Sequence, residues 1–535
     1  MRQRDSIHHT TQLIAVTTIC FAAAFAVGCS FEDSETTPIS IPRADCGMAS
    51  DGAFMPPPSA SADAGMGMPT NPGPVEDPTI QPKPGDMIEN DFIETATETT
   101  STFGIDVDTA SYTLMRGEVN ADRLPDKNTV RVEEFINYFD YAYPQPGQPD
   151  VAPFSVNLDM APSLFGDTGA QLLRIGLQGY VVPDKDRLPA NLVFLVDISG
   201  SMGSQNKLPL VKVLLKELVD RLRPDDTLAI VTYSNLITKL LPATPVKTKG
   251  PILSAIDSLR ASGSTAGGPG MITAYQVAEA AKKPNGINRV VLCTDGDFNL
   301  GVRGQTLIDL IKSYRDDKKI TLSVFGFGMG NYQDHFLEQL ADNGDGNYAY
   351  IDSADEAVKV ASSKLVGMLQ VIAKDVKIQV EFDTATVKAY RLIGYENRLL
   401  ENKDFKDDTK DAGEIGAGHH VTAFYELKLQ PGVAAQGNVA TVRLRFKAPK
   451  SDVSREFETS LDLAKAATSF AQASDDFRFA AAVAELAETL RDSKHTTGDR
   501  LADVAAVIQA TSGTDVDRVE LTQLLAKIQT LRAQP

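Results

Sequence analysis

Short apolar runs alternate with helix-like segments between Asn191 and about Ala373, and this alternation constrains the fold more than any other feature of the chain. The apolar runs are 192–196, 228–231, 290–293 and 320–325, and the helix-like segments are 208–222 and those centred near Ile256, Val277, Leu310 and Leu337. Continuously apolar strands are typical of a parallel sheet that is covered on both faces. The pattern therefore predicts an α/β domain over 188–373 with a doubly wound, mostly parallel sheet. A final helix is expected from about Glu356 to Ile372.

The segments on either side of this domain carry a different pattern. Apolar and polar residues alternate with period two at 376–382, 421–427 and 442–446, which predicts antiparallel strands with one face in water. Residues 101–187 contain few strands, and small isolated sheets are only marginally stable. We therefore expect 101–187 and 374–462 to pack into one β-rich domain, with the α/β domain inserted between its halves. Residues 463–535 are predicted to be helical, with two apolar stripes that favour packing faces over membrane or cofactor surfaces.

Residues 1–28 have the features of an export signal. Arg2 and Arg4 precede an apolar run from Leu13 to Val27, which is too short to predict a membrane span. The run ends at Cys29, and this junction resembles a bacterial lipobox, which implies that Cys29 is lipidated and becomes the mature N-terminus. The alternative is an ordinary cleaved signal in which Cys29 has no role. Because Ser30 follows the cysteine, the resemblance favours lipid anchoring in the outer membrane of a bacterial cell envelope.

Residues 29–100 are predicted to form a disordered tether behind that lipid. Nine prolines lie between Pro56 and Pro84, and such a segment cannot bury enough apolar surface to fold. Cys46 lies in this tether and Cys293 in an apolar strand, so we expect no disulfide between them. The formal net charge of −19 argues against a nucleic-acid binder, which needs a basic face to displace counterions.

Oxygen-rich side chains follow two of the apolar strands and one intervening loop. Asp197, Ser199 and Ser201 follow the first strand, Thr265 lies in a glycine-rich loop, and Asp295 follows the strand 290–293. In an open α/β sheet, ligands bind beyond the carboxyl ends of the strands. Mg²⁺ prefers near-octahedral oxygen coordination and keeps several waters. The sequence therefore predicts a divalent-cation site made of these five residues.

These motifs resemble the metal-ion-dependent adhesion site of von Willebrand factor A domains. The family pattern is Asp-x-Ser-x-Ser, a threonine on a second loop and an aspartate on a third, and all five residues are present. The resemblance implies that Ser199, Ser201 and Thr265 ligate Mg²⁺ (or Mn²⁺ or Ca²⁺), while Asp197 and Asp295 hold its waters. It also implies that an Asp or Glu carboxylate of a protein partner fills the open position, and that the chain is not an enzyme.

The resemblance extends beyond the α/β domain. The segments 106–112, 132–139 and 477–483 resemble those of a bacterial lipoprotein family in which an A domain lies between an N-terminal segment and a C-terminal domain of unknown function. That similarity covers roughly residues 90–530. It implies a location in the cell envelope and contact with other proteins.

Two other functions are weighed against this interpretation. A haloacid-dehalogenase-like phosphatase also places an aspartate after its first strand, but it needs a second acid two residues on, where this chain has Ser199. A structural envelope protein would use the metal only to hold loops together. The match of Ser204 and Lys207 to the Ser-x-x-Lys pattern of penicillin-recognising enzymes is interpreted as chance, and the pair Asp106 and Asp108 as helix capping rather than a cation loop.

Overall fold

A computed structural model describes residues 88–149, 151–264, 270–296, 304–328, 334–362, 364–496 and 498–533. The predicted signal 1–28, the lipidation site Cys29, the tether as far as residue 87 and the predicted ligand Thr265 lie outside the described residues. Within these ranges, none of the helices combines the length and the apolar character needed to span a lipid bilayer.

The inserted domain is built on a six-stranded sheet in the order β10-β9-β8-β5-β6-β7. Its strands are β5 (Ala190–Asp197), β6 (Thr227–Tyr233), β7 (Ile237–Pro245), β8 (Ile287–Thr294), β9 (Thr321–Phe327) and β10 (Tyr348–Ile351). All neighbouring pairs are parallel except β6 and β7. The predicted doubly wound, mostly parallel sheet is confirmed.

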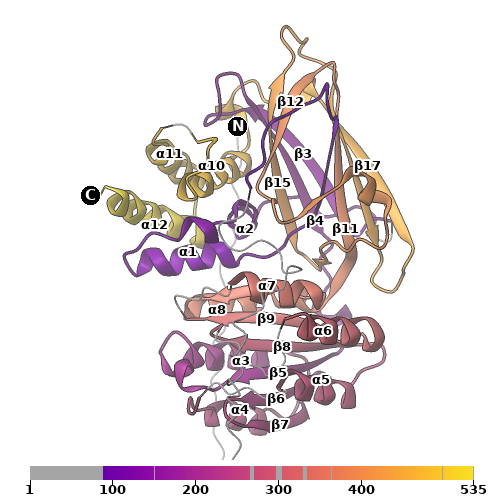
Figure 1. The fold of residues 1–535 in the computed structure, drawn as a ribbon, viewed down its shortest axis with the longest axis vertical. Coiled ribbons are helices and arrows are strands. Elements are labelled where there is room, and N and C mark those ends of the chain that lie inside the picture. Colours follow the sequence, from indigo (N-terminus) through magenta and orange to yellow (C-terminus); the bar gives the residue numbers. More distant parts are fainter. Residues whose placement is uncertain are drawn as a thin grey trace, which may run out of the picture. The chain divides into compact units, whose positions relative to one another are not determined.

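Helices cover both faces of this sheet, as Figure 1 shows. They are α3 (Leu208–Arg221), α4 (Lys249–Ser258), α5 (Gly270–Ala280), α6 (Gln305–Lys318), α7 (Asp334–Asn343), α8 (Ala354–Ser362) and α9 (Leu365–Leu369). Successive residues of a strand point to opposite faces, so Leu192 and Phe194 of β5 pack with α3, α4 and α8, while Val193 and Leu195 pack with α5, α6 and α7. This two-sided burial explains why β5 is apolar throughout.

The rest of the described chain forms two further sheets, in the orders β1-β12-β15-β4-β3 and β13-β2-β11-β16-β17. Their strands are β1 (Ile93–Glu94), β2 (Thr100–Gly104), β3 (Phe154–Pro162), β4 (Gln171–Gly179), β11 (Val371–Phe382), β12 (Val387–Ile393), β13 (Leu399–Leu400), β15 (His420–Leu429), β16 (Asn438–Lys447) and β17 (Ser454–Asp462), and β14 (Ile415–Gly416) pairs with β11. Each sheet contains strands from before and after the inserted domain. Their inner faces share one apolar core, which makes them a β-sandwich.

Five helices pack together against the outer face of the first of these sheets. They are α1 (Ala110–Asn120), α2 (Val132–Asn137), α10 (Asp475–Leu490), α11 (Leu501–Thr511) and α12 (Val516–Arg532). Both predicted C-terminal stripes are buried in this cluster, together with Leu172 and Phe424 of the sheet. The stripes are therefore packing faces, as predicted.

Three expectations about local structure need correction. The expected tether ends before residue 100, because β1 pairs with β12 and the Asn90 side chain donates to the carbonyl oxygens of Leu392 and Gly394 at 3.1 and 2.8 Å. The expected helix 356–372 is two short helices, α8 and α9, and β11 already begins at Val371. A side chain at Gly367 of α9 would collide with the ring of His419, so α9 lies close against the sandwich.

The pair Asp106 and Asp108 does not cap a helix. Helix α1 begins after Thr109, whose side chain makes no capping hydrogen bond. Asp106 accepts a hydrogen bond from the Asp108 amide at 3.0 Å, and Asp108 accepts one from the Tyr348 amide of β10 at 3.0 Å. Asp108 therefore joins the N-terminal segment to the inserted domain, and Asp106 holds Asp108 in place.

Candidate metal centre

The candidate site lies at the carboxyl end of β5, where the connections leave the sheet in opposite directions. β5 lies between β6 and β8, and all three strands are parallel. Loops that follow neighbouring parallel strands on either side of such a switch point enclose a crevice. Asp197, Ser199 and Ser201 lie on the loop after β5, and Asp295 lies directly after β8. The structure thus brings together the four predicted site residues that it describes.

Asp197 is the last residue of β5 and is fully buried. Its Oδ1 accepts a hydrogen bond from the Ser199 amide at 2.7 Å, which fixes the turn into the loop. Among the described residues its Oδ2 accepts no well-aligned hydrogen bond, and the hydroxyl of Tyr233 is the neighbouring donor that lowers the pKa of Asp197. Burial raises the pKa of Asp197 to about 6, and the neighbouring charge of Asp295 adds to the rise. Burial of a carboxylate costs free energy unless hydrogen bonds or a positive group compensate for the lost hydration.

The two loop hydroxyls lie side by side. Oγ of Ser199 and Oγ of Ser201 are 2.9 Å apart, with Ser199 buried and Ser201 exposed. Ser199 is the residue directly before the short helical turn Gly200–Gly203, and Ser201 lies within that turn. The hydroxyl pair therefore offers two neutral oxygen ligands at one point, open to solvent on the Ser201 side.

Backbone hydrogen bonds hold a second loop against the first. The Gly200 amide donates to the Gly263 carbonyl at 2.9 Å, and the Ser262 amide donates to the Ile198 carbonyl at 2.8 Å. Gly263 has a φ of +84°, a conformation that glycine adopts without strain. These contacts fix the stretch that leads to Thr265, which itself lies outside the described residues.

Asp295 supplies the second carboxylate and is also buried. Its Oδ2 accepts a hydrogen bond from the ammonium group of Lys207 at 2.8 Å. Sequence analysis missed Lys207 as a site residue, although it noted this lysine within the Ser-x-x-Lys match. The signal that could have found it is its position at the end of the Asp-x-Ser-x-Ser loop, directly before α3.

The donor set fits a small divalent cation. Mg²⁺–oxygen distances of about 2.0–2.1 Å place ligands at adjacent octahedral corners about 2.9 Å apart. The Ser199 and Ser201 hydroxyl oxygens have that separation, 2.9 Å. The buried carboxylate of Asp197 supplies negative charge and an acceptor for a coordinated water.

A second group of acids is not a metal site. Asp106, Glu134 and Glu338 are buried, with carboxylate oxygens within 4.8 Å of one another. Arg131 pairs with Glu134 and, at 3.2 Å, with Glu338; Arg398 pairs with Asp106 and Glu338, each at 3.3 Å. The two guanidinium groups supply the positive charge that a cation would bring, so this cluster is an ion-pair network between the inserted domain and the sandwich.

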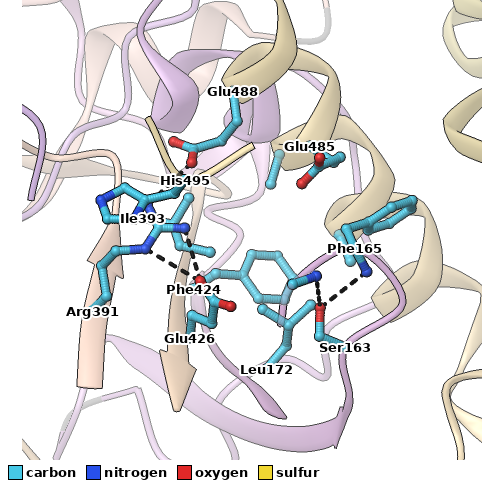
Figure 2. Close-up of a pocket in the computed structure, with 13 residues that line it drawn as sticks. Ser163, Phe165, Leu172, Arg391, Ile393, Phe424, Glu426, Glu485, Glu488 and His495 are labelled. Carbon is cyan, nitrogen blue, oxygen red and sulfur yellow. Dashed lines mark hydrogen bonds and ion pairs between the residues drawn. The ribbon is translucent and has the colours of Figure 1, made fainter. Parts of the chain in front are cut away.

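A small pocket between α10 and the sandwich is also part of the packing rather than a ligand site. Figure 2 shows Arg391 of β12 next to Glu426 of β15, with the α10 residues Glu485 and Glu488 above them. Arg391 pairs with Glu426 at 3.0 Å and with Glu488 at 3.1 Å. The cavity has a volume of about 20 Å³, which is room for a water molecule but not for an organic ligand.

The doubly wound sheet and its Asp-x-Ser-x-Ser loop define a von Willebrand factor type A domain protein, and that domain family matches residues 191–363. Two further families match the flanking segments, described as "von Willebrand factor" over 83–174 and "Uncharacterized protein YfbK, C-terminal" over 367–531. The chain belongs to the YfbK family. It is 37% identical over 461 residues to "Uncharacterized protein YfbK" of Escherichia coli (strain K12), an alignment that covers 82% of this chain and 79% of that protein.

The chain is also similar to more distant proteins. "Uncharacterized protein sll0103" of Synechocystis sp. is 26% identical over 344 residues, covering 62% of this chain and 80% of that protein. A solved structure titled "von Willebrand factor type A from Catenulispora acidiphila" has 15% sequence identity and a TM-score of 0.40, covering 74% of this chain and 91% of that one.

Proposed function

We propose that this chain is a protein-binding module of the bacterial cell envelope that captures an acidic residue of its partner through a bound divalent cation. The observation that carries the proposal is the arrangement of two adjacent loop hydroxyls, Ser199 and Ser201, next to the buried carboxylate of Asp197. This set lies at the switch point of the sheet, where an α/β fold binds ligands.

Mg²⁺ is the proposed ion. Ser199, Ser201 and Thr265 would hold it directly, and Asp197 and Asp295 would accept hydrogen bonds from its waters. Ca²⁺ needs longer ligand distances, about 2.3–2.6 Å, and takes six to eight oxygen ligands in a flexible geometry. Three direct protein ligands suit Mg²⁺ or the similarly coordinated Mn²⁺, because these ions keep several waters in their octahedral shell.

A carboxylate is the proposed partner group because the direct ligands are neutral hydroxyls. Bound by neutral oxygens and water, the cation keeps most of its charge and attracts an anionic ligand. The formal net charge of the whole chain is −19, which repels acidic partners at long range. Screening beyond about 8–10 Å at physiological salt limits that repulsion, so the attraction at the metal can prevail at contact.

Lipid anchoring at Cys29 and a place in the outer membrane complete the proposal. The support is the resemblance of the residues around Gly28 and Cys29 to a lipobox. The prolines up to Pro84 would then separate the folded domains from the membrane surface by an extended tether.

Binding is favoured over catalysis by the residue at the second position after Asp197. A phosphatase of the haloacid dehalogenase type needs an acid there to protonate the leaving group, and Ser199 is instead hydrogen-bonded to Ser201 at 2.9 Å. A purely structural metal remains the second candidate, and capture of a partner separates it from the adhesion role.

Crosslinking in intact cells tests the partner directly. The wild type and the variant Asp197→Ala are crosslinked with and without a chelator, and the attached proteins are identified by mass spectrometry. The proposal expects one set of crosslinks near Ser201 that disappears both with the chelator and in the variant. Crosslinks that persist in both conditions would show that the partner binds elsewhere.

A further inference from the structure

The side chain of Lys207 reaches into the candidate metal centre from the start of α3. Its ammonium group is 2.8 Å from Oδ2 of Asp295, and the side chains of the two residues are 18% and 2% exposed. This contact joins the loop after β5 to the loop after β8, the two segments that carry the predicted acids. Lys207 is therefore a cation that the chain itself supplies to the site.

The surrounding backbone makes room for this lysine. Gly328, directly after β9, has a φ of +85°, and a side-chain carbon at this position would collide with Cε of Lys207. The backbone of Lys207 is fixed as well, since its amide donates to the Ser204 carbonyl and its carbonyl accepts from the Val211 amide, both at 3.1 Å. The stem of Lys207 thus packs against Gly328 and ends at Asp295.

A divalent ion and this ammonium group would meet the same carboxylate. The centre holds two acids, Asp197 and Asp295, and Lys207 neutralises one of their charges. Two cations next to each other repel, and the repulsion is strong where water is partly excluded. An ion that uses Asp295 to hold its waters must therefore weaken or displace the contact with Lys207.

We propose that Lys207 is a tethered cation that competes with the metal ion for Asp295 and thereby sets the affinity of the centre. The inference rests on the proposed metal-binding function. Without metal, Lys207 holds the loops after β5 and β8 together. With metal, its ammonium group moves away from Asp295. The centre is then an exchange site in which binding of the ion is coupled to release of the lysine.

Calorimetric titration of the full mature chain with MgCl₂ tests this competition, using Lys207→Met and a matched control. Methionine keeps the apolar stem beside Gly328 but removes the charge. Lys216→Met is the control because it makes the same change in net charge on the exposed side of α3, where Lys216 pairs with Asp257. The proposal expects Lys207→Met to bind Mg²⁺ about tenfold more tightly than the wild type, about 1.4 kcal/mol, and Lys216→Met to bind like the wild type.

The outcomes separate this inference from the proposed function. Equal affinity of the wild type and Lys207→Met would overturn the competition while leaving the metal site intact, and so would weaker binding by the variant. No binding by either protein would overturn the metal site and the inference with it. Binding by Lys207→Met alone would support both. A second variant, Lys207→Gln, and thermal melting of each metal-free protein show whether a changed affinity reflects the charge or a changed fold. A gain in affinity shared by both Lys207 variants, with unchanged melting temperatures, supports the competition. A gain found only together with an altered melting temperature counts against the competition.

Discussion

The amide of Leu188 donates a hydrogen bond to the side-chain oxygen of Gln370 at 3.0 Å. Leu188 lies just before β5, the first strand of the inserted domain, which is the A domain. Gln370 lies just before β11, the first strand after that domain. The chain therefore enters and leaves the A domain at one place. Adjacent ends are what allow a domain to be inserted into a loop of another.

Removal of the A domain should leave a folded sandwich. If residues 190–369 are replaced by a short glycine–serine linker, both sheets of the sandwich keep all their strands, since the linker has only the Leu188–Gln370 gap to span. We expect a monomer with a cooperative thermal transition, measured by circular dichroism and light scattering.

The fragment 374–535 alone should aggregate, because β11 and β15 lose their neighbours β2 and β4. A cooperative transition in that fragment would contradict the composite domain.

Arg116 is expected to be the strongest single contact between α1 and the A domain. Its guanidinium group donates to Asp352 at 2.6 and 2.7 Å and to Glu356 at 2.8 Å, and all three side chains are buried. Arg116→Met leaves two buried carboxylates without this partner, so the free energy of unfolding should fall by about 3 kcal/mol. Denaturant unfolding measures the loss.

Arg123→Met, just after α1, is the matched control. Arg123 pairs with Glu118 at 2.7 Å, but its side chain is 54% exposed. Exposed pairs contribute little, so this substitution should change the free energy of unfolding by less than about 0.5 kcal/mol. Equal losses for Arg116→Met and Arg123→Met would show that burial of the first pair has no energetic importance.

Glu485 should make the stability of the sandwich depend on pH. In the described part of the chain its Oε1 is buried without a hydrogen-bond partner, and burial, with a smaller effect of Glu488, raises its pKa from 4.5 to about 8. Because the folded protein binds this proton more tightly than the unfolded chain, Glu485 destabilises the fold progressively as pH rises from about 4.5 to 8.

Glu485→Gln should remove this dependence, since glutamine cannot ionise. The variant should match the wild type near pH 4.5 and exceed it in thermal stability by about 1 kcal/mol or more at pH 8. Glu458→Gln, at an exposed position of β17, is the control and should not change the pH profile. A constant difference between Glu485→Gln and the wild type across the range would contradict the raised pKa.

Cys29→Ser tests the membrane anchor. If Cys29 carries lipid, the variant should move from the membrane fraction to the soluble fraction, while Cys46→Ser should stay with the membrane. Fractionation and detergent phase separation measure the distribution. Cys29→Ser that still partitions like the parent would show that lipidation is not what anchors the chain.

Local pattern was enough to predict the A domain. Val193 and Leu195 pack on one face of β5, and Leu192 and Phe194 on the other, so the strand has to be apolar at every position. The spacing of Asp197, Ser199 and Ser201 identified the loop at its end, because these side chains are neighbours in sequence. The structure places Asp295 beside that loop, as parallel strands require.

Features that depend on distant partners could not be read from local pattern. Asp106 and Asp108 precede a helix and therefore suggested capping, but their partners are Arg398, at 3.3 Å from Asp106, and the Tyr348 amide. The placement of α9 also depends on a distant partner, since Gly367 packs against His419 of the sandwich. Lys207 was not recognised as a site residue for the same reason, because its partner Asp295 follows another strand, β8.

Calorimetric titration with Mg²⁺, Mn²⁺ and Ca²⁺ on the wild type and on Asp197→Ala tests the central claim most directly. The apolar sheet supplies most of the stability, so the variant should keep its fold, as circular dichroism can verify. We predict that the wild type binds Mg²⁺ or Mn²⁺ at one site, binds Ca²⁺ more weakly, and that Asp197→Ala binds none of them. Absence of binding to the wild type at millimolar metal, or equal binding to both proteins, would contradict the assignment of the centre.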